Sequence, residues 1–488
     1  MAYRYGNREQ IELFPQAIED YVTKDDPVRA YDAFCEALDF SELGIALDEN
    51  HVGNPQYDPK AMVKLLVYGY SYGIRSSRKL ERAVYHNISF IWLMGSLKPD
   101  HKTIANFRRH NTHTIKYILK QCAQLCMKLG LIEGNTLFTN GTKIRSNASI
   151  KNTWDKEKCA SYLKHIDKHI ESILTECEKI DEEEQNQNSL VKMEQSLKEQ
   201  ETLKTKVKDI LEELNKDNKK SINTIDQEAV RINSVHGSHA GYNAQIVVDE
   251  KFGFIVHTDA TSTNNDAKLL SSQIDGANLT LGKKCKTVCA DTGYFDTEDL
   301  DKLSEQDIQV IVPTRRLVSK KGPKEFEKER FKYDDKSDTY ICPEGHILRY
   351  SFINNNGKNR VYRISKSSLC RQCRRFSTCT KSKRGRTILT QANEHIRKKL
   401  ESDYIKPESQ AIYSLRKQKA ELPFGHIKRN LKVDAFLLRG RDGARLEMSL
   451  LSSCFNISRI ISIFGVRGFI QQIRESLLPL QKESYFNN

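Results

Sequence analysis

The stretch from residue 155 to residue 218 constrains the fold most, because it contains neither Gly nor Pro and is rich in Lys, Glu and Gln. Apolar residues recur there at helical spacing in two sets: Leu163, Ile166, Ile170 and Ile173, then Leu197, Leu203, Val207 and Ile210. A polar run, Glu182 to Asn188, separates the two sets. The pattern predicts two long helices folded back as a hairpin, with a spacer or a dimer contact as its role.

The segments on either side of this hairpin have a different pattern of apolar and polar residues. Short apolar runs predict strands at 136–139, 245–248, 254–258, 287–290 and 309–312, with a helix expected from Asp266 onward. A strand pair followed by alternating strands and helices indicates a mixed sheet with covered faces. The hairpin is therefore expected to be an insertion into an α/β core.

Residues 1–130 show short helical patterns instead, several of them preceded by a polar capping residue. The last pattern begins after Asp100 and bears Lys102, Arg108 and Arg109, which predicts a helix-turn-helix that contacts DNA. An all-helical bundle whose basic residues face water explains the same pattern equally well.

The charge distribution indicates which class of molecule the protein binds. The chain has 488 residues and a net charge of +14, and residues 351–390 contain eleven Lys or Arg but no Asp or Glu. Such a block favours nucleic acid as a partner, ahead of an acidic membrane. The first residues lack an apolar signal segment, and polar residues interrupt the apolar stretch 450–464. We therefore expect a cytoplasmic protein without a membrane span.

Some of the twelve cysteines are spaced like metal ligands. In a reducing compartment, Cys370-Arg-Gln-Cys373 with Cys379 and Cys342 predicts a Zn²⁺ site, with His346 as an alternative to Cys342. Reduced structural cysteines remain the other explanation. The neighbouring basic residues suggest DNA contacts rather than a solvated loop, and they include Arg371, Arg374 and Arg375.

Two acidic residues stand out for their surroundings. Asp291 directly follows the predicted strand 287–290, at the edge where open α/β sheets place their sites, although a turn explains an isolated Asp as well. Glu421 lies among the basic residues Arg416, Lys417 and Lys428, a setting that suits phosphates gathered around a metal or ordinary charge pairs on a helix. Pro423 and Gly425 predict a break or a kink just after Glu421, which would put Lys428 in another segment.

Three segments together resemble one family. They are Asn140-Gly-Thr-Lys-Ile, Ala-Asp291-Thr-Gly-Tyr, and the pattern Y-x-x-R-K-x-x-x-E-x-P-F-G-x-I-K from Tyr413 to Lys428. In this order they resemble the DDE transposases of bacterial insertion sequences, in the branch with a helical N-terminal region and a cysteine-bearing insertion. Tyr57-Asp-Pro and Pro99-Asp-His-Lys-Thr-Ile extend the resemblance over nearly the whole chain.

The resemblance implies an α/β fold with a ribonuclease-H-like mixed-sheet core built from 135–150, 225–315 and 391–475. Around it lie a helical N-terminal DNA-binding region (1–130), the helical-hairpin insertion (155–218) and a basic, cysteine-containing insertion (316–390). Three acidic residues then converge on two Mg²⁺ or Mn²⁺ ions, with Asp291 as the second ligand and Glu421 as the third. Further DNA contacts are expected from Lys143, Tyr413, Arg416, Lys417 and Lys428.

The first catalytic position departs from the family pattern, because Asn140 stands where the family has Asp. An amide offers a carbonyl oxygen but no charge, so metal binding and transition-state stabilisation should both weaken. No acidic residue lies between Glu133 and Asp155. The chain is then an inactive copy, an engineered inactive variant, or a protein that uses another carboxylate such as Asp249 or Asp266.

The sequence therefore predicts an enzyme, a DDE transposase of an insertion sequence. It would act as a homodimer on double-stranded DNA, bind terminal inverted repeats and target DNA, and perform metal-dependent cleavage and strand transfer at the nucleoid. Asn140 leaves its activity open. The alternatives are an inactive repeat-binding protein that represses transposition and a metal-dependent nuclease.

Overall fold

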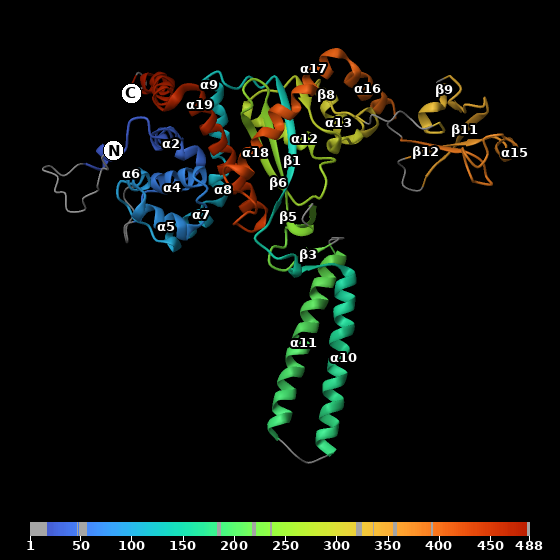
Figure 1. The fold of residues 1–488 in the computed structure, drawn as a ribbon, viewed down its shortest axis with the longest axis horizontal. Coiled ribbons are helices and arrows are strands. Elements are labelled where there is room, and N and C mark those ends of the chain that lie inside the picture. The colour runs from blue at the N-terminus through green and yellow to red at the C-terminus, as the bar shows by residue number, and fades with distance from the viewer. Residues whose placement is uncertain are drawn as a thin grey trace, which may run out of the picture.

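The computed structural model describes residues 17–45, 47, 56–182, 187–216, 221–234, 237–318, 325–334, 336–354, 359–391 and 394–485. At its centre is a six-stranded mixed sheet with the order β4-β5-β1-β7-β8, in which β6 also pairs with β5 (Figure 1). The strands are β1 (Thr136–Arg145), β4 (Val230–Ser234), β5 (Gly237–Asp249), β6 (Ile255–Thr261), β7 (Thr287–Cys289) and β8 (Gln309–Ile311).

The register of the sheet brings two distant segments to one place. β1 runs antiparallel to β5 and parallel to β7, and β7 runs parallel to β8. Phe138 pairs with Cys289, so Asn140 and Asp291 each lie two residues beyond this pair. The strand expected at 136–139 is longer than predicted, because β5 pairs with β1 as far as Arg145. Asn140 therefore lies inside a strand and not in the segment that follows one.

Helices cover the sheet and position its loops. They are α12 (Leu270–Leu281), α13 (Thr297–Ser304), α14 (Arg315–Val318), α16 (Glu394–Ile405), α17 (Pro407–Arg416) and α18 (Leu422–Arg429), with a 3-10 turn η2 (Thr292–Tyr294) after β7. The helix expected from Asp266 begins later, at Leu270, because Lys268 has a left-handed backbone with φ +67°. Asp266 thus lies in the loop before α12.

The N-terminal region is helical and shares a core with the C-terminal helix. It consists of α1 (Ile18–Tyr21), α2 (Pro27–Glu36), α3 (Phe40–Leu43), α4 (Pro59–Ser71), α5 (Ser77–His86), α6 (Ile88–Leu93), α7 (His101–His110), α8 (Thr112–Ile115) and α9 (Ile118–Lys128). Helix α19 (Gly440–Tyr485), kinked at Gly465, packs against α2, α4, α9 and β6. By length and composition α19 could cross a membrane, but most of its apolar window is buried inside the protein, as in a core helix.

Two long helices fill the stretch without Gly or Pro. α10 (Lys156–Glu182) and α11 (Gln187–Lys216) pack along each other and project away from the sheet (Figure 1). Their shared core contains Ile166, Val207 and Leu214. A 3-10 turn η1 (Ile150–Asn152) and the short pair β2 (Thr153–Trp154) and β3 (Ile222–Asn223) close the base of the hairpin. Residues 183–186, within the polar run expected to join the helices, lie outside the described residues.

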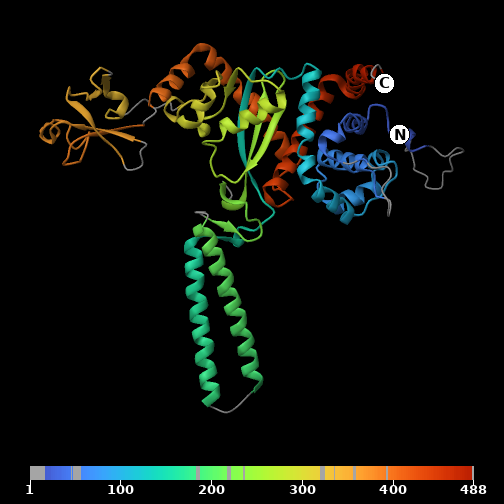
Figure 2. The same ribbon diagram turned by 180° about the vertical axis from the view of Figure 1, so that it is seen from behind.

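The cysteine-containing segment forms a small β unit with its own core. Its antiparallel sheet has the order β13-β12-β11-β10-β9 and lies on the side of the central sheet opposite the N-terminal helices (Figures 1 and 2). The elements are η3 (Lys328–Arg330), β9 (Lys332–Asp334), β10 (Thr339–Ile341), β11 (Ile347–Ile353), β12 (Asn359–Ile364), α15 (Ser367–Arg371) and β13 (Thr387–Gln391). Phe331, Tyr340, Leu348 and Tyr362 are buried between them.

Candidate active site

Glu421 ends a π-helical segment, η4 (Lys417–Glu421), that lies between α17 and α18. The helix is not broken after Glu421, because the backbone stays helical through Leu422, but it changes there from the π segment to α18, which has Pro423 in its first turn and contains Lys428. A proline inside a helix lacks an N–H and collides with the carbonyl four residues earlier, and the wider π turn accommodates both effects. The π segment contacts β1 and β5, so Glu421 is carried to the sheet.

Asn140 joins β1 to this segment. Its Nδ2 donates a hydrogen bond to the Ala420 carbonyl at 3.0 Å, and its Oδ1 accepts one from the Gly141 N–H at 2.9 Å. Ala420 directly precedes Glu421, which places the first and third positions of the family pattern side by side. Glu421 itself accepts a hydrogen bond from the Arg416 guanidinium at 3.1 Å and is half exposed.

Asp291 caps the 3-10 turn after β7 and lies against Asp266. Its Oδ1 accepts a hydrogen bond from the Gly293 N–H at 2.8 Å. A Cβ on Gly293 would lie 2.9 Å from Asp291 Oδ1 and 3.4 Å from Asp266 Oδ2, so the two carboxylates flank this glycine. Asp266 Oδ1 in turn lies 2.7 Å from the position of a Cβ on Gly141, next to Asn140. Asp266 therefore lies between Asp291 and the Gly141 position of β1, on the face of the strand opposite to the Asn140 side chain.

Several basic residues surround these carboxylates. Lys143 Nζ lies 3.6 Å from Asp266 Oδ1, and Lys428 Nζ donates to the Thr142 hydroxyl at 2.5 Å. Burial lowers the pKa of Lys143, although the charges of Asp266 and Asp291 act in the opposite direction.

Two other residues expected to contact DNA lie along the helix that leads to Glu421. Lys417 is exposed on η4. The Tyr413 ring packs edge-on against Tyr404 at 5.1 Å, with the Arg416 guanidinium 5.8 Å from its centre. Of these basic and aromatic residues, Arg416 is the one with a direct contact to Glu421 among the described residues.

The N-terminal residues predicted to contact DNA differ in exposure. Lys102 and Arg109 are exposed on α7, and Lys102 lines a groove between α5 and α7. Arg108 is 6% exposed, and its guanidinium donates to the Arg75 carbonyl at 2.9 Å and to Ser77 Oγ at 3.3 Å. This geometry gives Arg108 a packing role between α5 and α7. Its position four residues after the buried Ile104 is the sequence signal for that role.

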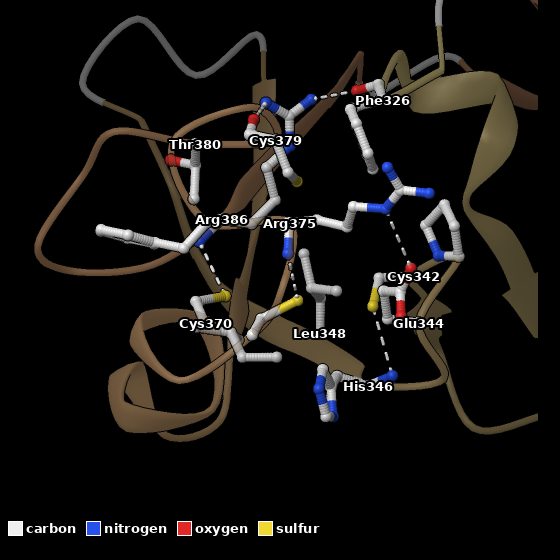
Figure 3. A pocket seen from close by; sticks show the side chains of 14 residues that line it. Phe326, Cys342, Glu344, His346, Leu348, Cys370, Arg375, Cys379, Thr380 and Arg386 are labelled. Carbon is white, nitrogen blue, oxygen red and sulfur yellow. Dashed lines mark hydrogen bonds and ion pairs between the residues drawn. The ribbon is translucent and has the colours of Figure 1, made fainter.

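The four predicted cysteine ligands line a single cavity in the β unit (Figure 3). Three of the sulfurs accept backbone N–H bonds: Cys342 from His346 at 3.2 Å, Cys373 from Arg375 at 3.4 Å and Cys370 from Arg386 at 3.4 Å. Burial raises the pKa of the fourth thiol, that of Cys379, and the other three cysteines raise it as well.

Basic residues surround this cavity, but two of those predicted to contact DNA are already paired. Arg374 and Arg375 form ion pairs with Glu344 at 2.9 Å and 3.6 Å, whereas Arg371 is exposed at the end of α15. Within the described ranges, no three His, Cys, Asp or Glu side chains are arranged so that they could hold a metal ion. Binding of a metal ion therefore requires the side chains to move, both at the cysteines and at the acidic site.

Sequence reasoning missed the polar support of Asp266. Asn243 Nδ2 and Gln245 Nε2 donate to Asp266 Oδ1 at 2.7 Å and 2.9 Å, and Tyr294 donates to Gln245 Oε1. Asn243 and Gln245 are fully buried in strand β5, where their neighbours Ala244 and Ile246 are apolar. Two buried amides at alternate positions of one strand were the signal that could have found this support.

Comparisons with known proteins assign the chain to a family. A family model described as a transposase domain (DUF772) matches residues 16–110, and a transposase DDE domain matches residues 341–461. The chain is a DDE transposase of insertion-sequence type. The second match covers the four cysteines Cys342, Cys370, Cys373 and Cys379 and also Glu421, whereas β1 and Asp291 fall between the two matches. No curated protein matches the transposase.

One solved structure is similar to the transposase over much of its length. It is the cryo-EM structure of the piggyBac transposase synaptic complex with hairpin DNA. The match has 9% identity and a TM-score of 0.33 and covers 93% of this chain and 80% of that chain. A similarity of this size supports no statement about the fold, so the assignment to the family rests on the two domain matches.

Proposed function

We propose that this protein binds the terminal inverted repeats of its element and cleaves and joins DNA at a site formed by β1, the end of β7 and η4. The observation that carries the proposal is the meeting of Asn140 with Ala420 at 3.0 Å, because it brings the Glu421 segment to the strand beside Asp291. The strand order β6-β5-β1-β7-β8, three antiparallel strands continued by two parallel ones, supports a ribonuclease-H-like core.

The donor set at this site fits a hard divalent cation, Mg²⁺ or Mn²⁺. Asp291 and Glu421 offer carboxylate oxygens, the ligands that these ions prefer. The Lys143 ammonium is paired with Asp266 at 3.6 Å but has no hydrogen bond among the described residues, so its N–H donors are available to a phosphate. When bound, the cation would supply activation of the attacking oxygen and stabilisation of the leaving one.

The chain's own residues would prepare the site for DNA. Arg416 neutralises Glu421 and orients it, and it can turn to a phosphate when an ion takes its place. Lys143, in β1, and Lys428, which donates to Thr142 of β1, would attract the scissile phosphate by charge. The turn at Gly293 keeps the Asp291 carboxylate fixed by a backbone N–H, so little reorganisation is needed during the reaction.

The remaining parts would serve assembly on double-stranded DNA. We propose that the groove between α5 and α7, with Lys102 at its edge and Arg109 nearby, contacts the repeats, and that Arg371 extends the contact. Two element ends have to be held together during transposition, so we propose a homodimer, with the α10–α11 hairpin as a candidate contact. The protein would then act in the cytoplasm, at the nucleoid and not at a membrane.

We further propose that Cys342, Cys370, Cys373 and Cys379 hold one structural Zn²⁺. Backbone N–H bonds to three of the sulfurs stabilise thiolates, and thiolates are the ligand form of cysteine. The full chain should contain one zinc per molecule by elemental analysis, and Cys373→Ser should lose it, while the control Cys285→Ser should not. A zinc content of zero in the unmodified chain contradicts the site.

The activity is tested with a duplex that carries the inverted ends flanking the reading frame. In Mg²⁺ the chain should nick this duplex and form strand-transfer products, and Glu421→Gln should abolish both reactions. Glu408→Gln, an exposed Glu to Gln change on α17, is the matched control and should cleave normally. Equal cleavage by Glu421→Gln and Glu408→Gln contradicts the proposed site, and cleavage without strand transfer indicates a nuclease.

The second candidate function is a repeat-binding protein that represses transposition without catalysis. The observation that favours it is Asn140, whose uncharged amide bonds to a carbonyl where the family has a carboxylate. Specific binding to the repeats together with a complete lack of cleavage in Mg²⁺ and Mn²⁺ would identify this function.

A further inference from the structure

The small β unit has an outer face that its own core does not use. Leu348, Tyr362 and Ile388 point inward from β11, β12 and β13 and are buried. Successive side chains of a strand alternate between the two faces, so Arg349 and Arg363 point outward, and both are exposed. The unit stands apart from the N-terminal helices and from the α10–α11 hairpin (Figures 1 and 2). This outer face is therefore open to a partner.

A β-bulge brings an aromatic side chain to the outer face. The register of β11 against β12 shifts between Tyr350 and Phe352, so that Phe352 pairs with Val361. Val361 precedes the inward-pointing Tyr362 and therefore points outward, and Phe352 lies on the same side. Leu389 pairs with Val361 from β13. Phe352 and Leu389 are 39% and 56% exposed, so the face offers apolar surface as well as charge.

The strands of the outer face do not compensate its positive charge. Arg349 and Arg363 pair directly across β11 and β12, and like charges in such a pair destabilise a sheet. β11, β12 and β13 contain no Asp or Glu. Asp334 lies on the same face in β9, but β10 separates it from Arg349, which corresponds to about 10 Å. Its carboxylate accepts hydrogen bonds from Lys336 and Ser337. The face is therefore suited to an anionic partner.

Phe352 indicates which kind of anion fits this face. The Arg363 guanidinium lies 4.7 Å from the centre of the Phe352 ring, so a cation and an aromatic ring are held together. Unpaired bases stack on aromatic rings and on guanidinium planes, and a sheet with exposed aromatic residues is a known platform for them. The bases of a duplex are stacked on one another, so a duplex would offer this face mainly its phosphates. A single strand matches both the charge and the aromatic ring.

We infer that the outer face of the β unit binds an unpaired strand of DNA, in which Phe352 stacks on one base and Arg349 and Arg363 bind neighbouring phosphates. The inference rests on the proposed function for the identity of the nucleic acid, because cleavage at the acidic site frees DNA ends whose last bases can unpair. It gives the β unit a partner different from the duplex repeats that the groove between α5 and α7 would contact.

The test measures binding of the full chain to a labelled oligothymidylate, which forms no duplex, and to a duplex of the terminal repeat, both by fluorescence anisotropy. Phe352→Ala should weaken binding of the oligothymidylate by about fivefold or more and leave the duplex affinity within about twofold. Phe252→Ala is the matched control, because Phe252 is 38% exposed and also has a cation, Lys251 Nζ, 5.7 Å from its ring centre. This control should bind the single strand normally.

The arginines are tested through the salt dependence of binding. Arg349→Ala should reduce the slope of log K against log salt for the oligothymidylate by about 0.7, the share of one phosphate contact on a single strand. Arg349→Lys keeps the charge and should keep the slope. Leu389→Glu places a carboxylate on the exposed face without touching the core, and it should also weaken single-strand binding. The melting temperatures of these variants should equal that of the unmodified chain.

Each result has a distinct consequence. Unchanged single-strand affinity in Phe352→Ala and Leu389→Glu overturns the inference, as does failure of the unmodified chain to bind the oligothymidylate, while cleavage of the repeat duplex would still support the proposed function. An equal loss of duplex affinity in Phe352→Ala overturns it as well, because the face would then contact duplex DNA. Binding to phosphatidylglycerol vesicles that depends on Phe352, with unchanged single-strand binding, would identify a membrane contact and overturn it. Single-strand binding that depends on Phe352 without any cleavage of the repeat duplex supports this surface and rejects the proposed activity.

Discussion

Replacing Arg75 by Ala is expected to destabilise the protein strongly, because it leaves a buried carboxylate without its cation. Arg75 Nη1 lies 3.0 Å from Glu447 Oε2, and the two side chains are 10% and 0% exposed. The other oxygen, Oε1, accepts the backbone N–H groups of Leu437 and Leu438, each at 2.6 Å. The pair therefore joins the N-terminal region, the loop after α18 and helix α19.

The size and the pH dependence of the effect follow from this burial. Removing one partner of a buried ion pair costs about 3–5 kcal/mol, and the two remaining N–H bonds place Arg75→Ala near the lower end, at about 3 kcal/mol. Burial raises the pKa of Glu447, and Arg75 lowers it. Without Arg75 the pKa of Glu447 in the folded state should rise further. Protonation of Glu447 then stabilises the folded variant at low pH, and this stabilisation is lost as the pH rises through that pKa. The destabilisation should therefore be larger at pH 8 than at pH 5.

Urea titrations of the full chain at the two pH values measure this difference. The matched control is Arg467→Ala, whose ion pair with Asp25 at 2.5 Å is 66% and 65% exposed, so its loss should cost less than about 1 kcal/mol. Arg75→Ala combined with Glu447→Gln should recover part of the stability, because no buried charge is left. Equal destabilisation by Arg75→Ala and Arg467→Ala refutes the reasoning.

Three further substitutions probe the site and the DNA contacts. Gly293→Ala should reduce cleavage by at least about tenfold with an unchanged melting temperature, because the added Cβ lies 2.9 Å from Asp291 Oδ1, and normal cleavage would show that the close approach is unimportant. Lys428→Ala should reduce the slope of log K against log salt by about one in a repeat-binding titration, and an unchanged slope contradicts a phosphate contact. Arg108→Ala should lower the melting temperature, and a loss of DNA affinity with unchanged stability would contradict its packing role.

The sequence named candidate positions for the site but not their contacts. Asp291 and Glu421 were assigned from the resemblance to the family motifs, and the register of β1 and β7 places residues 140 and 291 each two residues beyond the Phe138–Cys289 pair. The pairing of Arg416 with Glu421 could not be predicted, because it depends on how η4 is wound. Pro423 and Gly425 suggested a break or a kink, and the chain accommodates the proline with a π turn just before it.

The elements themselves were predictable where the pattern was long and periodic. The two helices of the hairpin follow directly from apolar residues at helical spacing over a stretch without Gly or Pro. The full length of β1 was not predictable, because residues 140–145 are polar or glycine except for Ile144, and β5 pairs with them throughout. The loop that holds Asp266 depends on a left-handed backbone at Lys268. The conformational preference of lysine does not predict such a backbone.

Iron-mediated cleavage of the polypeptide tests the convergence of the acidic residues most directly. Fe²⁺ bound at the Mg²⁺ site generates radicals in ascorbate and peroxide that cut only the backbone close to the ion. The account predicts three cuts in the same molecule, near residues 140–143, near 291–293 and near 417–421, all suppressed by excess Mg²⁺ and absent in Glu421→Gln. Cuts near only one of these segments, or cuts that Mg²⁺ does not suppress, would contradict the claim that they share one metal site.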